Sequence, residues 1–146
     1  DTILLSVTIK NARTHFFDIE YPKRYYQGEN PVKCPSTFNC PVEATLDLIG
    51  GKYKALILWH LIDTTLRFNE IGKLIPQATP KMLTQQLREL EADTLIVRTC
   101  YPVVPPKVEY ALSDFGKSII PILEAMCKWG ENYLDAVTVK SGYDKK

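Results

Sequence analysis

The sequence lacks the features that identify most exported and membrane-anchored proteins. None of its 146 residues belongs to an apolar run long enough to span a bilayer. The apolar segment 2–9 is short and has no basic region before it, so it does not read as a signal peptide. Internal repeats and low-complexity tracts are also missing. We therefore expect a cytoplasmic protein of one ordinary domain with an extra N-terminal segment.

Metal-binding and catalytic motifs are missing as well. The four cysteines, at positions 34, 40, 100 and 127, do not have zinc-site spacing, and the two histidines, at 15 and 60, are remote from one another. No nucleophile elbow, phosphate loop or carboxylate constellation is present. We expect no metal, no cofactor and no enzymatic activity.

An excess of positive charge is the third absence. With 18 basic and 17 acidic residues the formal net charge is +1, which does not by itself indicate a nucleic-acid binder. Binding depends, however, on where the cations lie. Basic residues gather in the part of the chain that carries the pattern described next: Lys52, Lys54, Arg67, Lys81, Arg88, Arg98 and Lys107. This distribution predicts modest, salt-sensitive DNA affinity.

What the sequence does contain is a helix, a tight turn and a second helix in its middle third. Phe68, Ile71 and Leu74 recur every three residues, as expected for one face of a short helix. The segment 75–78 breaks that pattern. Thr79 then restarts it as an N-cap, with a proline at the first helical position.

The second helix, 79–90, is apolar on one face and polar on the other. Leu83, Leu87 and Leu90 have the spacing of a buried face. The polar side presents hydroxyl, amide and basic groups: Thr79, Lys81, Thr84, Gln85 and Arg88. Such a face suits a DNA major groove, where a lysine can bind guanine and a glutamine can pair with adenine. Arg88 lies one turn further on and serves either a base or a phosphate.

A hairpin follows the two helices. Segments 95–101 and Lys107–Leu112 alternate in hydrophobicity, and the proline-rich segment 102–106 joins them at a rigid tip. Helix, helix and hairpin in this order are the winged variant of the helix-turn-helix. Arg98 and Lys107 would contact phosphates or the adjacent minor groove, or they are merely solvated. Support for Arg67 and Lys52 as phosphate contacts is weaker.

Two helices are predicted ahead of this motif. Pro41–Ile49 carries Val42, Leu46 and Ile49 on one face and ends at a glycine pair. The helix 52–62 is apolar on nearly every side and should occupy the middle of the core. Residues 1–39 differ in composition from the rest of the chain, and we interpret them as an arm that packs on the body of the domain or on a second subunit.

After the hairpin we predict one long final helix, capped by Ser113 and bent by Pro121. An apolar stripe spaced 4-3-4-3-4 runs along it: Phe115, Ile119, Ile122, Met126, Trp129 and Tyr133. The stripe is wider than one contact needs, so part should cover the core and part should meet a second subunit. We assign residues 40–146 to a mainly α winged helix-turn-helix domain with a C-terminal dimerisation helix. The expected dimer interface comprises Ile119, Ile122, Met126, Trp129 and Tyr133.

Cys40 stands immediately before the predicted helix Pro41–Ile49. A thiol there faces the positive end of the helix dipole, which favours the reactive thiolate. Cys34, a short loop away, could then act as resolving partner within one chain or across a dimer. The alternative is that Cys40 is a small packing residue. Cys127 is most simply a packing residue, and Cys100 remains open.

The ordered blocks CPVEATLDLIGGKYKALIL, RFNEIGKLIP, TPKMLTQQLRELEAD, VPPKVEYALSDFGKSIIPIL and CKWGENY resemble HxlR-type transcriptional regulators, winged-helix proteins of the MarR-like group. The resemblance covers roughly residues 40–133. It implies a homodimer that binds operator DNA near a promoter, with 79–90 as recognition helix. It also implies sensing of oxidants or electrophiles through a cysteine where Cys40 stands.

The sequence departs from this family in three places. Thr94 stands where the family usually has glycine, which puts the geometry of that turn in question. Cys100 occupies a wing position that is more often another residue, and the leader through Asn39 is longer than usual.

Two other functions compete with a thiol-sensing DNA-binding regulator. A winged helix can serve as a protein-interaction module. A small-molecule effector could instead bind between helices, in a cavity lined by aromatics such as Trp59 and Trp129.

Overall fold

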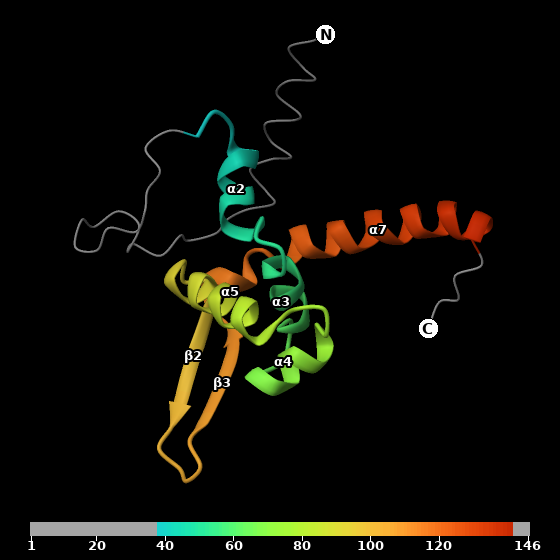
Figure 1. Cartoon of the computed structure of the whole chain (residues 1–146). Coiled ribbons are helices and arrows are strands. Elements are labelled where there is room, and N and C mark those ends of the chain that lie inside the picture. Colours follow the sequence, from blue (N-terminus) through green and yellow to red (C-terminus); the bar gives the residue numbers. More distant parts are fainter. Residues whose placement is uncertain (1–37, 142–146) are drawn as a thin grey trace. The chain divides into compact units, whose positions relative to one another are not determined.

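The computed structural model describes residues 38–141, so residues 1–37 of the predicted arm, Cys34 among them, lie outside the described residues. The elements, in chain order, are α2 (Pro41–Ile49), α3 (Lys54–His60), β1 (Leu66–Arg67), α4 (Phe68–Leu74), α5 (Pro80–Ala92), β2 (Ile96–Tyr101), β3 (Lys107–Leu112), α6 (Asp114–Lys117) and α7 (Ile120–Ser141) (Figure 1). This mainly α chain with one small sheet confirms the predicted winged helix-turn-helix.

The helix-turn-helix consists of α4 and α5. The hydroxyl oxygen of Thr79 accepts a hydrogen bond of 3.2 Å from the backbone N–H of Met82, and Pro80 opens α5, as predicted. One detail of α4 was predicted wrongly. Leu74 is 47% exposed, whereas Ile71 and Ile75 are fully buried, because the α-helical repeat places residue i+4 rather than i+3 under the core here.

The core lies between α3, α5, the sheet and the start of the last helices. Leu83, Leu87 and Leu90 of α5 are buried as predicted. They share one cluster with Ile57 and Leu58 of α3. The prediction that α3 is enclosed on nearly every side was too broad, because its outward positions leave Leu56 and Trp59 partly exposed.

The sheet has three antiparallel strands in the order β1-β3-β2. The β2–β3 hairpin, seen side by side in Figure 1, confirms the predicted wing. Strand β1 was not predicted, since its two residues are too short to show any periodicity. It pairs Leu66 with Tyr110 and Arg67 with Glu109. The start of α4 is thereby attached to the wing.

Thr94, which follows α5, keeps the turn that a glycine would favour. Its φ is 60°, in the left-handed region that side chains with a branched Cβ rarely adopt. Its hydroxyl oxygen is buried and has no hydrogen-bond partner among the described residues. The turn is therefore formed at an energetic cost.

The prediction of one long final helix was wrong. Ser113 does act as an N-cap, accepting a 2.8 Å hydrogen bond from the N–H of Gly116, but the helix it starts is the short α6. Residues 118–119 form a turn that ends α6, and α7 begins at Ile120. Pro121 therefore lies in the first turn of α7, where its missing N–H costs nothing, and it does not bend a continuous helix.

Among the described helices, none combines the length and hydrophobicity that crossing a membrane would require.

Candidate nucleic-acid interface

The outward face of α5 is polar and accessible. Lys81, Gln85 and Arg88 are exposed, while Thr84 is half-buried and donates its hydroxyl proton to the carbonyl oxygen of Pro80 at 2.8 Å. A groove of about 580 Å³ follows this face, lined by Phe68, Pro80, Lys81, Thr84, Gln85, Arg88 and Glu89. The side chains predicted to read DNA thus lie along one groove, except for the N-cap Thr79, whose hydroxyl is used in capping.

The Gln85 side chain is held within the protein. Its amide nitrogen donates to one carboxylate oxygen of Glu89 at 3.1 Å. The other carboxylate oxygen of Glu89 lies 2.8 Å from the ammonium of Lys54. Lys54 is only 6% exposed, so its placement among the DNA-side cations was wrong: the lysine points inward and neutralises an acid on α5.

Asp93, the C-cap of α5, interacts electrostatically with both Lys54 and Glu89. Burial raises the pKa of its carboxyl above the ordinary value of 3.8, and the nearby carboxylates of Asp47 and Glu89 raise it further. The ammonium of Lys54 acts in the opposite direction. Charges from α2, α3 and α5 therefore converge behind the recognition helix.

The buried position of Gln86 on α5 was not predicted from the sequence. Gln86 is 9% exposed, and its side-chain oxygen accepts a hydrogen bond of 3.4 Å from the N–H of Tyr53. The Tyr53 hydroxyl in turn donates to the carbonyl oxygen of Gln77 at 3.0 Å. The spacing contained the signal, because residue 86 falls on the same face as Leu83 and Leu90. These bonds fix α5 and the preceding turn against α3.

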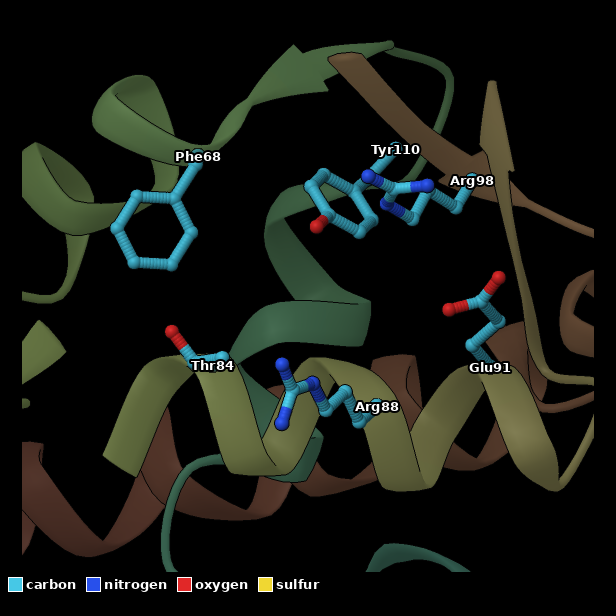
Figure 2. A pocket seen from close by; sticks show the side chains of 6 residues that line it. All are labelled: Phe68, Thr84, Arg88, Glu91, Arg98 and Tyr110. Atoms are coloured by element: carbon cyan, nitrogen blue, oxygen red, sulfur yellow. The ribbon is translucent and has the colours of Figure 1, made fainter. Parts of the chain in front are cut away.

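A cavity of about 380 Å³ separates α5 from the sheet. Figure 2 shows Thr84 and Arg88 on the α5 side of it, Phe68 at the start of α4, and Arg98 beside Tyr110. The remaining lining residue is Glu91. Neither Arg88 nor Arg98 forms an ion pair or hydrogen bond within residues 38–141. The fold therefore brings two guanidinium groups, distant in sequence, to one site, with the carboxylate of Glu91 also in its lining.

The cations of the wing are more constrained. The Lys107 ammonium lies 2.8 Å from the Glu109 carboxylate and 5.1 Å from the centre of the Tyr101 ring. The hydrogen bond from Lys107 lowers the pKa of Glu109, and Arg67 lowers it further. Arg67 and Lys107 both line a cleft of about 460 Å³ between α4 and the wing tip. Lys107 would have to share its charge between Glu109 and any phosphate.

Lys52 is exposed, and its ammonium lies 5.3 Å from the centre of the Tyr53 ring. It lines none of the three cavities described above. The same is true of Trp59 and Trp129, the residues considered for an effector cavity.

Cys40 occupies the N-cap position of α2, and Pro41 follows at the first helical position. Its side chain is exposed and makes no capping hydrogen bond. Cys100 is exposed on β2, whereas Cys127 on α7 is half-buried. Cys40 is thus accessible to a reagent in solution.

The apolar stripe of the last helices divides into a buried and an exposed part. Ile119 is 8% exposed and packs in the core of its own subunit, so its assignment to a dimer interface is corrected. Ile122 is half-buried against the same core. Further along α7 large side chains face solvent: Met126, Trp129, Tyr133 and Leu134, with exposed fractions of 49%, 70%, 55% and 46%.

A second apolar surface lies on α2. Val42 and Leu46 are 63% and 58% exposed, whereas Ile49 on the same predicted face is buried. On α7 the rings of Trp129 and Tyr133 stack with centroids 5.7 Å apart. Large apolar side chains so exposed on two helices mark a surface suited to a protein partner.

Comparison with known proteins identifies the family to which this architecture belongs. The family model of HxlR-like helix-turn-helix proteins matches residues 48–138. YdeP of Bacillus subtilis (strain 168), described as an uncharacterised HTH-type transcriptional regulator, is 56% identical over 98 residues, which are 67% of this chain and 77% of YdeP.

Solved structures of regulators are also similar to this chain. The redox regulator HypR in its oxidised form is 54% identical with a TM-score of 0.62, over 64% of this chain and 96% of HypR. The reduced form of the transcriptional regulator YodB from B. subtilis is 31% identical with a TM-score of 0.56, over 73% of this chain and 100% of YodB. The residues that the family model matches, 48–138, include both the helix-turn-helix and the wing.

Proposed function

The chain belongs to the HxlR-like helix-turn-helix family and is a transcriptional regulator, not an enzyme, and we propose that it binds operator DNA sequence-specifically as a homodimer. In this proposal α5 enters the major groove and the wing lies against the adjacent backbone. Because operator DNA is its partner, we place its action in the cytoplasm.

One observation carries the DNA-binding proposal. The leucines of α5 are buried in the core, while its opposite face is polar and accessible, carries Arg88 and lies near Arg98. Neither guanidinium group is paired within residues 38–141. A protein-docking face would instead be expected to present apolar anchors. This favours DNA over the alternative of a winged-helix interaction module.

The residues of the interface have different proposed roles. Lys81 and Gln85 contact base edges, since they lie in the N-terminal half of α5. Thr79 and Thr84 flank them. Backbone phosphates are contacted by Arg88, Arg98, Lys107 and Arg67, with Lys52 as a weaker candidate.

Dimerisation rests on the exposed apolar side chains of α7 and α2. Met126, Trp129 and Tyr133 form the proposed centre of the interface, with Ile122 at its edge. A single recognition helix reads only a few base pairs, so useful specificity needs two half-sites about 34 Å apart. We assign residues 40–146 to this domain, and residues 1–39 to an arm.

We further propose that Cys40 senses oxidants or electrophiles. Its exposed position at the N-cap of α2 supports this role, as does the similarity to HypR, which is described as a redox regulator. An oxidant such as diamide would accept two electrons and two protons from Cys40 and a second thiol, for which Cys34 is the candidate, leaving a disulfide. Regulation by a small-molecule effector without thiol chemistry is the alternative.

The DNA-binding proposal is tested by selecting bound sequences from a random duplex pool, followed by mobility shifts across a salt titration. Gln85→Ala should cost about 1–3 kcal/mol at one base pair and relax the preference there. An equal loss of affinity on operator and random DNA would contradict the role of Gln85. Failure of the unmodified protein to enrich any sequence would contradict specific binding altogether.

The sensor proposal is tested by repeating the operator titration after treatment with diamide or a quinone. We expect operator affinity to change in the unmodified protein and to stay constant in Cys40→Ser. Unchanged affinity after mass spectrometry has demonstrated modification of Cys40 would reject the sensor.

A further inference from the structure

A chain of three polar side chains runs from the core to the outer face of the recognition helix. Lys54 of α3 contacts one oxygen of Glu89, and Glu89 accepts the amide N–H of Gln85 with its other oxygen. Gln85 and Glu89 are one helical turn apart on α5. Lys54 is buried and cannot itself reach DNA.

This arrangement determines which end of the Gln85 amide faces outward. An ionised carboxylate can only accept hydrogen bonds, whereas a glutamine amide has a donating nitrogen and an accepting oxygen. The nitrogen of Gln85 must therefore face Glu89, and the carbonyl oxygen faces away from it. A flipped amide would place two acceptors against each other.

The carboxylate of Glu89 is itself held in place. A buried ammonium without a partner is strongly unfavourable, so Lys54 retains Glu89 as its counter-ion. Asp93 and Asp47 add negative charge around Lys54 from the end of α5 and from α2. Lys54 is therefore directed toward the back of α5.

We propose that Lys54 and Glu89 are positioning residues that orient the Gln85 amide, so that α5 offers a hydrogen-bond acceptor to the major groove and selects a base with an exocyclic amino group. Adenine N6 and cytosine N4 are the donors that such an acceptor recognises there. Guanine O6 and thymine O4 on the opposite strand are acceptors, so Gln85 should contact the strand that carries the amino group of that pair. The inference rests on the proposed function, since it requires α5 to read bases.

The test uses the full chain and selection from a random duplex pool. Gln85→Ala first identifies the base pair that Gln85 reads, as the pair whose preference is lost. Glu89→Gln is then compared with the unmodified protein at that pair. A glutamine at 89 can donate or accept, so the Gln85 amide is free to flip. We expect discrimination for adenine or cytosine to fall by about fivefold or more at that pair alone.

Glu91→Gln is the matched control. It removes the same charge from the same helix, and Glu91 makes no hydrogen bond to Gln85. It should raise affinity for all sequences slightly and leave the base preference unchanged. In a Gln85→Ala background, Glu89→Gln should add no further change at the base pair, because it acts through Gln85.

Removing only Glu89 leaves Lys54 buried without its main counter-ion and could prevent folding. The double variant Lys54→Met/Glu89→Gln removes both charges and keeps the test available, with circular dichroism as the check on folding. Unchanged operator affinity when the exocyclic amino group at the Gln85 pair is deleted, with purine in place of adenine or 2-pyrimidinone in place of cytosine, would overturn the inference. So would an unchanged preference in a folded Glu89→Gln variant or double variant. No enrichment by the unmodified protein would instead defeat the proposed function.

Discussion

Replacing Thr94 by glycine should stabilise the protein, although most substitutions at half-buried positions destabilise. Thr94 is held at φ 60°, and its buried hydroxyl oxygen lacks a hydrogen-bond partner in the described part of the chain. Both features follow from the turn between α5 and β2. The backbone N–H of Thr94 bonds to Glu91, and that of Leu95 bonds to Leu90, so the turn conformation is imposed by the end of the helix.

The magnitude follows from opposing contributions. Left-handed geometry costs a side chain with a Cβ about 1–2 kcal/mol. Burying an unpaired hydroxyl costs about 1–3 kcal/mol. Glycine loses up to about 1 kcal/mol through the greater freedom of the unfolded chain, and deleting the methyl group loses about 0.8 kcal/mol of burial. At the middle of these ranges the favourable contributions exceed the unfavourable ones by about 1–2 kcal/mol, which for a chain of this size corresponds to a rise in Tm of about 2–8 °C.

Urea and thermal unfolding at one fixed protein concentration would measure this effect, because stability depends on concentration if the chain dimerises. Thr94→Ala separates the two causes, since it removes the hydroxyl but keeps a Cβ at positive φ. Asp63→Gly is the matched control. Asp63 also has a positive φ, 55°, but aspartate tolerates that region, so the gain should be much smaller. A Thr94→Gly variant no more stable than the parent would refute the reasoning.

Three further substitutions test other parts of the structure. Trp129→Glu should give a folded monomer by light scattering, with operator affinity reduced at least about tenfold; a persistent dimer would remove Trp129 from the interface. Lys107→Ala should flatten the slope of log affinity against log salt by about 0.9, whereas Lys117→Ala should not; equal slopes would place Lys107 away from phosphate. Asp93→Asn tests the raised pKa of the Asp93 carboxyl. Between pH 3.8 and that raised pKa, the native state binds more protons than the unfolded state. The free energy of unfolding of the parent, relative to that of the variant, should therefore fall as pH rises through this window. A pH-independent difference would contradict the shift.

Periodicity and capping chemistry predicted the helix-turn-helix and the wing because both are local. Thr79 and Pro80 start α5 whatever surrounds them, and the prolines after β2 end the strand in any context. The prediction was wrong where a local structure depends on contacts with parts of the chain that are distant in sequence. Strand β1 exists only because β3 lies beside Leu66 and Arg67, and no pattern of two residues could indicate that.

The candidate site was predictable in its residue types but not in its electrostatics. The helical repeat placed Lys81, Gln85 and Arg88 on the outer face of α5. It could not reveal that Lys54 turns inward to Glu89 or that Lys107 pairs with Glu109, because the choice of partner depends on tertiary distances. The long C-terminal stripe likewise looked continuous, and only the break before α7 separates core from exposed surface.

A net charge of +1 is compatible with salt-dependent DNA binding, because the salt dependence is set by the few cations that contact phosphates. The cations proposed to contact phosphates are Arg67, Arg88, Arg98 and Lys107, with Lys52 as a weaker candidate, whereas Lys54 is buried against Glu89. One subunit would then give a salt slope near about −4, and a dimer on two half-sites near about −7. A dimer therefore makes about twice as many phosphate contacts as one subunit and gains about twice the electrostatic part of the binding free energy. DNA binding should therefore be coupled to dimerisation, so that anything that separates the exposed surfaces of α2 and α7 also releases the DNA.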